Sequence, residues 1–404
     1  MPALPSRLSV DALARASVSA VCRAARHPAV DISLLDLDRI AMAYRSDRHL
    51  TIDARSPDVW SPLSGFWRVA DGWVRTHGNY PRHAQALRRA FGLGMDAGAD
   101  ALSSALAERS PTEAVRKITD AGGLAVPVLP ENPAADRALR TIPLVESIPL
   151  GRATRRRSPT GAGLDGIRIL DLTRVIAGPV CTRTLALLGA DVLRIDPPGL
   201  TEPGWQHLDT GHGKRSAILD ASSERFEELL ARADVVVLGY RPSALARLGL
   251  SRAALAERHP GLIVAELSAW GHEHPDRRGF DSLVQAESGI AMIESPDGER
   301  PGALPAQALD HSAGYLLTAA VCDAVHRRDE DGTALAVRTS LRRIAAELLG
   351  MPRTDDPGPE ASIDPAAHTE RFRVDGHDLV TVRSAIPGLS FNAPRPWGRD
   401  PAMW

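Results

Sequence analysis

A single carboxylate, Asp310, stands at the start of a long helix-like segment, "ALDHSAGYLLTAAVCDAV" (308–325). Leu316, Leu317, Ala320 and Val321 recur at helical spacing, which predicts an α-helix. Aspartate is a favoured helix N-cap, so Asp310 fits a purely structural role. A carboxylate near a helix start is also kept ionised by the helix dipole, as an attacking nucleophile requires. The local sequence therefore leaves a cap and a nucleophile both open.

The elements that would position this carboxylate alternate between strand and helix. The strand candidates are "GIRILDL", "ADVLRID", "DVVVLGY" and "GLIVAELSAW", with helix candidates "PVCTRTLALLG" and "SSERFEELLARA" between them. This order predicts an α/β fold with a Rossmann-like, doubly wound large domain. The turn "TRVIAGP" holds Gly178 alone and lacks GxGxxG, which argues against a nicotinamide cofactor. Such a sheet still binds other ligands at the carboxyl edge of its strands.

Two connector-like stretches divide the 404 residues, a basic one over 151–165 and a proline-rich one over 351–370. Residues 1–150 combine helical spacing with a hairpin around "ADG" and predict a smaller α+β domain. Residues 166–350 form the large domain. Residues 371–404 predict a hairpin around Asp375 and Gly376, followed by a proline-rich tail.

Composition favours a small-molecule partner. The net charge is −2, with 48 basic and 50 acidic residues, so no basic field indicates nucleic acid. Cys22, Cys181 and Cys322 lie far apart without a CxxC pair, so we expect no metal site from them and a reducing cytoplasmic location. The sequence lacks an apolar run of about 20 residues, so we expect no membrane span.

Several long blocks in register resemble the class III CoA-transferases, the CaiB/BaiF type. They include "LDGIRILDLTRVIAGPVCTRTLALLGADVLRIDPPG", "GHGKRSAILD", "ADVVVLGYRPSALARLGL", "RRGFDSLVQAESG" and "ALDHSAGYLLTAAVCDAVHRR". "FWRVADGWVRTHGN" and "ALAERSPTEAVRKITDAGGLAVPV" resemble the small domain of that family, which normally follows these blocks. The chain thus looks rearranged, with its small-domain segment placed N-terminal to the large domain. The resemblance also implies an interlocked homodimer.

By this resemblance, the protein moves CoA from an acyl-CoA to a carboxylic acid, and Asp310 is the nucleophile that carries the acyl group. Asp281 matches a second acidic position in the site, although a turn or cap aspartate is an equal alternative. Coenzyme A enters as a substrate thioester, and no tightly bound cofactor is implied. Oxyanion donors are expected from the backbone after Asp310. The positions that match CoA-contacting residues are Ile176, Ala177, Lys214, Arg215, Gly239, Tyr240, Arg247 and Arg278.

Two other functions stay open at this stage. The related α-methylacyl-CoA racemases have histidine before the second aspartate, whereas this chain has Phe280, which cannot carry a proton. A racemase-like isomerase is therefore disfavoured. A catalytically silent CoA-binding protein is the second alternative, because Ile176, Pro197 and Gly65 depart from patterns seen in some members. The acid and the acyl-CoA are left unspecified by the sequence.

Overall fold

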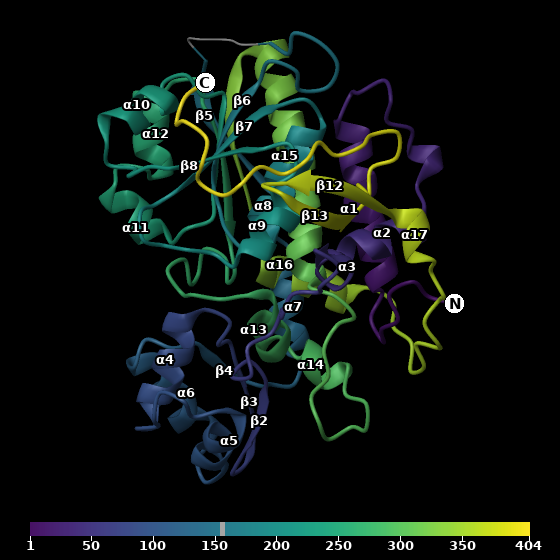
Figure 1. Ribbon diagram of the computed structural model, residues 1–404, viewed down its shortest axis with the longest axis vertical. Helices are drawn as coiled ribbons and strands as arrows, with labels where there is room; N and C mark the ends of the chain where they lie inside the picture. Colours follow the sequence, from purple (N-terminus) through teal and green to yellow (C-terminus); the bar gives the residue numbers. More distant parts are fainter. Residues whose placement is uncertain (154–157) are drawn as a thin grey trace.

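The main sheet lies in the upper, larger part of the molecule in Figure 1. The computed structural model describes residues 1–153 and 158–404, and seven strands of this part join in one sheet. Their order is β5 (Glu146–Arg152), β11 (Thr333–Ser340), β10 (Ile263–Ser268), β9 (Val235–Leu238), β6 (Arg168–Leu172), β7 (Asp191–Asp196) and β8 (Arg215–Ile218). All neighbours pair in parallel except β5, which is antiparallel to β11.

From β6 the chain adds β7 and β8 on one side of the sheet, and it then adds β9, β10 and β11 on the other side. Numbered along the chain from β6, these six parallel strands lie in the order 3-2-1-4-5-6 seen from β8, which is the Rossmann order. The predicted doubly wound sheet is thereby confirmed. Ligands of such sheets bind outside the carboxyl ends of the strands, at the switch point. That point lies after Leu172 in β6 and after Leu238 in β9.

Helices cover both faces of the main sheet because its strand residues alternate between two cores. Val235 and Val237 of β9 pack in one core, whereas Val236 and Leu238 pack in the other. The first core also holds α1 (Val10–Ala24), α8 (Ala177–Leu187), α15 (Ala308–Asp331) and α16 (Leu341–Gly350). The second core holds α10 (Glu224–Leu230), α11 (Pro242–Arg247) and α12 (Arg252–Arg258).

A smaller unit lies next to the carboxyl edge of the main sheet, at the bottom of Figure 1. It consists of an antiparallel sheet with β2 (Phe66–Val69), β3 (Gly72–Thr76) and β4 (Ala125–Pro127), and of α4 (Pro81–Ala90), α5 (Ala99–Ala107) and α6 (Pro111–Asp120). The predicted "ADG" hairpin joins β2 to β3. The segment 1–150 also contributes outside this unit, because α1 packs on α15 and β5 extends the main sheet.

The remaining helices of the middle of the chain are α7 (Pro133–Arg140), α9 (Gly204–Thr210), which packs against α8, α13 (Asp281–Glu287) and α14 (Ile290–Ile293). The 3₁₀ turn Ile32–Leu34, α2 (Leu37–Tyr44), α3 (Ser46–His49) and β1 (Thr51–Ile52) follow α1. The basic stretch 154–157 of the first predicted connector lies outside the described residues.

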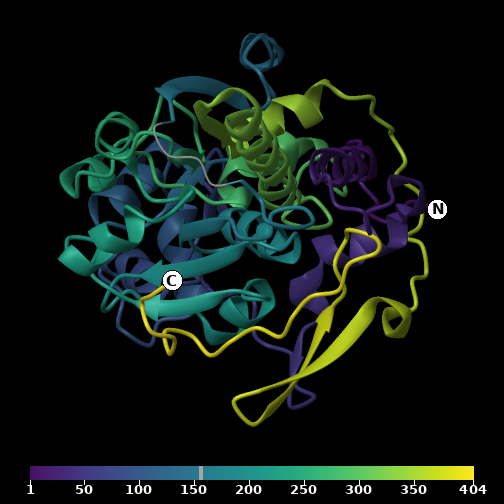
Figure 2. The same cartoon turned by 90° about the horizontal axis from the view of Figure 1, so that it is seen from above.

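The C-terminal segment wraps the outside of the large unit. After α17 (Pro365–His368), β12 (Thr369–Val374) and β13 (His377–Val382) form the predicted hairpin, with Asp375 and Gly376 both at positive φ. The tail then runs along the outer strand β8, where Ala217 bridges to Arg399. The two chain ends lie on different sides of the molecule (Figure 2).

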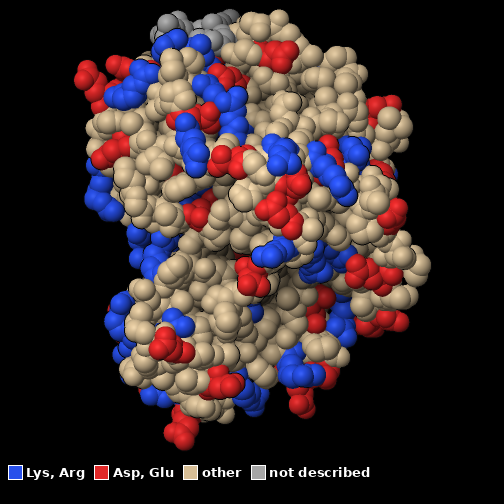
Figure 3. All heavy atoms as spheres, in the orientation of Figure 1, with Lys and Arg blue, Asp and Glu red and all other residues tan. Residues whose placement is uncertain are grey.

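On the face drawn in Figure 3, basic and acidic side chains are interspersed. Within the described ranges, none of the helices is both long and apolar enough to cross a bilayer.

Candidate functional site

A cavity of about 910 Å³ lies at the carboxyl edge of the main sheet, between the large and the small unit. It follows the ends of β6, β9, β10 and β11, and three inter-strand spacings make this edge about 14 Å long. Residues from both units line it. Those from the small unit are Tyr80, Arg82, His83 and Leu124.

Asp310 lines this cavity from the first turn of α15. Its side chain is largely buried, with 6% of the residue exposed. The N-cap of α15 is Gln307, three residues earlier, so of the two roles that the sequence left open for Asp310 the structure excludes the helix cap. Because side chains of the first helical turn point back toward the N-terminus, Asp310 can face the cavity without capping its own helix.

The carboxylate of Asp281 binds the backbone at the start of α15. Its Oδ2 accepts a hydrogen bond from the backbone N–H of Asp310 at 2.9 Å, and its Oδ1 accepts one from the Gln285 side-chain amide. Gln285 in turn accepts the N–H of Leu304 at 2.9 Å. Asp281 is fully buried and is not among the residues that line the cavity. Its carboxylate thus caps α15 from a neighbouring helix and fixes the backbone of Asp310.

The two carboxyls perturb one another. Burial, and then the charge of Asp281, raise the pKa of the Asp310 carboxyl well above its ordinary value. Burial also raises the pKa of Asp281 to about 6, although the N–H of Asp310 and the amide of Gln285 oppose this by stabilising its anion. Within residues 1–153 and 158–404, no group donates a hydrogen bond to the Asp310 carboxylate. Asp310 is therefore a weakly stabilised, basic carboxylate, and the expectation that the helix dipole keeps it ionised is wrong, because burial and the charge of Asp281 act in the opposite direction.

The backbone after Asp310 does not supply free donors. The N–H of His311 donates to the carbonyl of Gln307 at 3.1 Å, inside the helix. The expectation of oxyanion donors from this segment is therefore not supported. The start of α8 is better placed, because Ala177 lines the cavity and the first N–H groups of a helix have no partner within it.

Four of the predicted CoA-contacting residues line the cavity: Ala177, Gly239, Tyr240 and Arg278. Ala177 begins α8 at the switch point, and Gly239 and Tyr240 directly follow β9. Ile176 is the N-cap residue of α8, is half-buried, and packs against the core beside these residues instead of lining the cavity. The residues at the β6 and β9 ends were predictable because ligands of parallel sheets bind there.

Three other predicted cations are placed elsewhere. The ammonium of Lys214 is buried and donates to Asp171 Oδ2 at 3.1 Å and to Thr182 Oγ1 at 2.8 Å. Arg215 pairs with Asp191 at 2.6 Å on the outer strand, away from the cavity. Arg247 is exposed on α11 and does not line the cavity. The structure therefore places these three predicted residues outside the lining of the cavity.

Three further arginines that the sequence did not predict line the cavity. Arg82, Arg174 and Arg241 line the cavity together with Arg278. The guanidinium carbons of Arg82 and Arg174 lie 5.2 and 5.4 Å from the centre of the Tyr80 ring. The place of Arg174 at the cavity could have been predicted from the sequence, because this residue lies in the turn after β6, in "LTRVIAG". Arg82 was not, because only the packing of the small unit brings it to the cavity.

Phe280, the residue before Asp281, packs against aromatic side chains of the small unit. Phe280 stacks on His77 of the small unit, with ring centres 3.7 Å apart and planes 2° apart. Burial lowers the pKa of His77 well below its ordinary value, so this imidazole is neutral. A proton carrier at position 280 is absent, as the sequence indicated.

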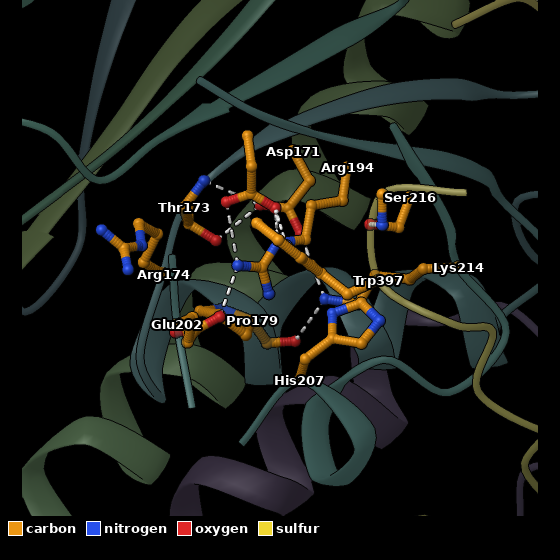
Figure 4. A network of polar contacts seen from close by, with 12 residues as sticks. Asp171, Thr173, Arg174, Pro179, Arg194, Glu202, His207, Lys214, Ser216 and Trp397 are labelled. Atoms are coloured by element: carbon orange, nitrogen blue, oxygen red, sulfur yellow. Dashed lines mark hydrogen bonds and ion pairs between the residues drawn. The ribbon is translucent and has the colours of Figure 1, made fainter. Parts of the chain in front are cut away.

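A buried polar network lies under the turn from β6 to α8 (Figure 4). Asp171 Oδ1 accepts hydrogen bonds from the N–H and the hydroxyl of Thr173, at 3.0 and 2.5 Å. Its other oxygen accepts the hydroxyl of Thr182 at 2.6 Å and the Lys214 ammonium. The role of Lys214 is thus to neutralise the carboxylate that shapes this turn.

The cavity thus lies at the switch point of a mostly parallel α/β sheet. The model of CoA-transferase family III matches residues 164–377, just over half of the chain. The chain therefore belongs to CoA-transferase family III.

The curated relatives are longer than the matched part. A probable fatty acyl-CoA transferase of Mycobacterium tuberculosis, Rv3272, is 32% identical, over 58% of this chain and 66% of that protein. A formyl-CoA:oxalate CoA-transferase of Rhodopseudomonas palustris is 30% identical over 44% of this chain and 46% of that protein. The chain thus matches between about half and two thirds of the length of these relatives.

Two solved structures are also similar in part. A crystal structure of Rv3272 from M. tuberculosis has a TM-score of 0.43 and 34% identity, covering 48% of this chain and 56% of that one. A CaiB/BaiF family protein from Brucella suis has a TM-score of 0.42 and 22% identity, covering 55% and 65%.

Proposed function

We propose that the protein transfers CoA from an acyl-CoA thioester to a carboxylic acid, with Asp310 as the covalent carrier. The observation that carries this proposal is the state of Asp310 in the cavity. Three other carboxylates line the cavity: Glu146 pairs with Arg338 at 2.9 Å, Glu266 pairs with Arg252 at 3.0 Å, and Glu273 is exposed. Asp310 is the buried carboxylate of the lining, and within the described part of the chain no cation lies within ion-pair distance of it, which leaves its oxygens free to attack a carbonyl.

The chemistry needs no group beyond the carboxylate and the two substrates. An Asp310 oxygen attacks the thioester carbonyl, the C–S bond breaks, and CoA leaves as thiolate from a mixed anhydride. The thiolate attacks the aspartyl carbonyl and releases the donor acid as carboxylate. The acceptor acid then attacks the aspartyl thioester, and the second thiolate attack on the acceptor carbonyl frees Asp310. Each acceptor molecule leaves one of its oxygens on Asp310.

The cations of the cavity support a phosphate-bearing substrate. Among residues 1–153 and 158–404, Arg82, Arg174, Arg241 and Arg278 have no carboxylate within ion-pair distance. Unpaired guanidinium groups attract phosphate and carboxylate anions. The cavity follows a sheet edge that is about 14 Å long, which lets the CoA phosphates lie apart from the reacting thioester.

The test is isotopic. The protein is incubated with an acyl-CoA and with heavy-oxygen-labelled acids, including oxalate and a 2-hydroxy acid, because relatives bear the names of transferases for these acids. We expect CoA transfer together with label in the peptide that contains Asp310, and neither with Asp310→Asn. The exposed Asp297→Asn serves as control and should behave as the parent. Transfer without label on Asp310 would exclude the covalent route, and CoA binding without transfer would indicate a silent member.

The homodimer stays a prediction. Light scattering at micromolar concentration should give twice the mass of 43.2 kDa. A monomer that transfers CoA would show that the small unit in the same chain completes the cavity by itself.

A further inference from the structure

The turn that leads from β6 into α8 contains a residue in an unfavourable backbone conformation. Val175 has a φ of +76°, in the left-handed region that β-branched residues avoid. It lines the cavity, two residues before Ala177. Such conformations persist where the surrounding structure imposes them, and they cluster at functional sites.

Glu202, on the loop between β7 and α9, is the group that binds this turn from outside. Its Oε1 accepts the backbone N–H of Val175 at 2.7 Å. Its Oε2 accepts a hydrogen bond from Arg194 Nη2. The side chain of Glu202 is 1% exposed, so water does not compete for these bonds (Figure 4). An N–H bonded to a buried carboxylate is one of the stronger backbone interactions.

Glu202 is itself held by groups that do not line the cavity. Arg194 forms a second, two-pronged contact with Asp196, at 2.8 and 3.0 Å. Asp196 Oδ2 also accepts the indole N–H of Trp397, from the C-terminal tail, at 2.8 Å. Removal of Glu202 would therefore leave Arg194 with a carboxylate partner.

The other end of the turn is fixed independently. Asp171 binds Thr173 through two hydrogen bonds, and Gly178 approaches Thr173 so closely that a Cβ would lie 2.3 Å from the Thr173 Cβ. With both ends of the turn fixed, the conformation of Val175 sets where Ala177 and the first N–H groups of α8 face the cavity.

We propose that Glu202 is a positioning residue of the CoA site, which holds Val175 in its left-handed conformation without touching the substrate. This inference rests on the proposed function, because it assumes that the cavity binds CoA. A simpler role, as an ion-pair partner of Arg194, would also explain the burial of Glu202. The two roles differ in which atom matters: the first needs an acceptor for the Val175 N–H, whereas the second needs a negative charge.

Four variants separate the roles: Glu202→Gln, Glu202→Ala, Val175→Gly and Val175→Gly with Glu202→Ala. CoA affinity is measured by calorimetric titration, and stability by urea unfolding. We expect both Glu202 variants to lose stability, since both lose the charge beside Arg194. Glu202→Gln keeps an acceptor oxygen and should bind CoA about as well as the parent. Glu202→Ala should bind about tenfold more weakly, because Val175 is then free to leave its unfavourable conformation.

The double variant is the decisive one. Glycine adopts positive φ without a steric penalty, so Val175→Gly should restore CoA affinity to Glu202→Ala without restoring the lost ion pair. Equal weakening by Gln and Ala, or failure of the glycine to rescue, would overturn the proposal and leave Glu202 as an ion-pair partner.

A second measurement keeps this test independent of the proposed function. If the parent binds no CoA, the proposed function fails, and crystal structures of the variants then decide. Residue 175 should lose its positive φ in Glu202→Ala and regain it in the double variant. A valine that keeps its positive φ without Glu202 would refute the positioning role.

Discussion

Replacement of Asp310 by asparagine should stabilise the folded protein at pH 8 and leave its stability unchanged near pH 4. The Asp310 and Asp281 carboxyls are both buried, and their pKa values are raised in the fold. A carboxyl with a raised folded-state pKa is favourable to folding while protonated, and this contribution is lost as pH rises through that pKa. The neutral asparagine cannot ionise, so the variant avoids the loss.

Burial, together with the charge of Asp281, raises the folded-state pKa of Asp310 well above its ordinary value of 3.8. Each pKa unit of this rise corresponds to about 1.4 kcal/mol of folding free energy that is present while the carboxyl is protonated and is lost when it ionises. We therefore expect Asp310→Asn to exceed the parent in free energy of unfolding at pH 8 by about 1.4 kcal/mol for each pKa unit of the rise. The difference should begin to develop above about pH 4 and grow as pH rises through the folded-state pKa.

Urea unfolding of both proteins at pH 4, 6 and 8 measures this difference, and titrating groups that do not interact with Asp310 cancel in the comparison. The exposed Asp355→Asn serves as control and should follow the parent at each pH. Loss of CoA transfer should accompany the gain in stability, as expected when a group is retained for chemistry at the expense of the fold. An Asp310→Asn protein that is equally stable or less stable at pH 8 would refute the account of the two carboxyls.

Three further outcomes follow from the packing. Lys214→Met should destabilise the protein by about 3–5 kcal/mol in urea unfolding, because it leaves the Asp171 carboxylate buried and unpaired. Arg82→Ala should weaken CoA binding and reduce its salt dependence, whereas Arg89→Ala on the same helix, outside the cavity, should do neither in titrations at two ionic strengths. Gly314→Ala places a Cβ 2.6 Å from a backbone oxygen of α8, so it should separate α15 from α8 and lower both the melting temperature and the rate of transfer.

The large unit was predictable because its signals are local. Strands such as Val235–Leu238 are continuous apolar runs, and the helices between them show the 3.6-residue period. The partner strand of β11 was not predictable, since β5 comes from residues 146–152 and reaches the sheet through tertiary pairing. For the same reason α1 was assigned to the small domain, although its apolar face packs on α15.

In the candidate site, too, the residues placed by local sequence were predictable and those placed by tertiary contacts were not. Asp310, Gly239 and Tyr240 stand directly at strand or helix ends, where sequence position fixes their place. Lys214 also lies next to a strand, but its ammonium group is buried in the core because it pairs with Asp171, 43 residues away along the chain. Proximity to a strand end therefore locates a backbone position, while the direction of a long side chain depends on distant partners.

The tail that runs beside β8 has a consequence for solubility. An outer strand with free N–H and C=O groups is a template on which another chain can add, and proteins escape such association by covering the strand. Here the C-terminal tail covers β8: Arg399 forms a β-bridge with Ala217, and the Trp404 indole N–H donates to the carbonyl of Leu229. A chain shortened before these residues should keep its cavity yet aggregate through the bared strand.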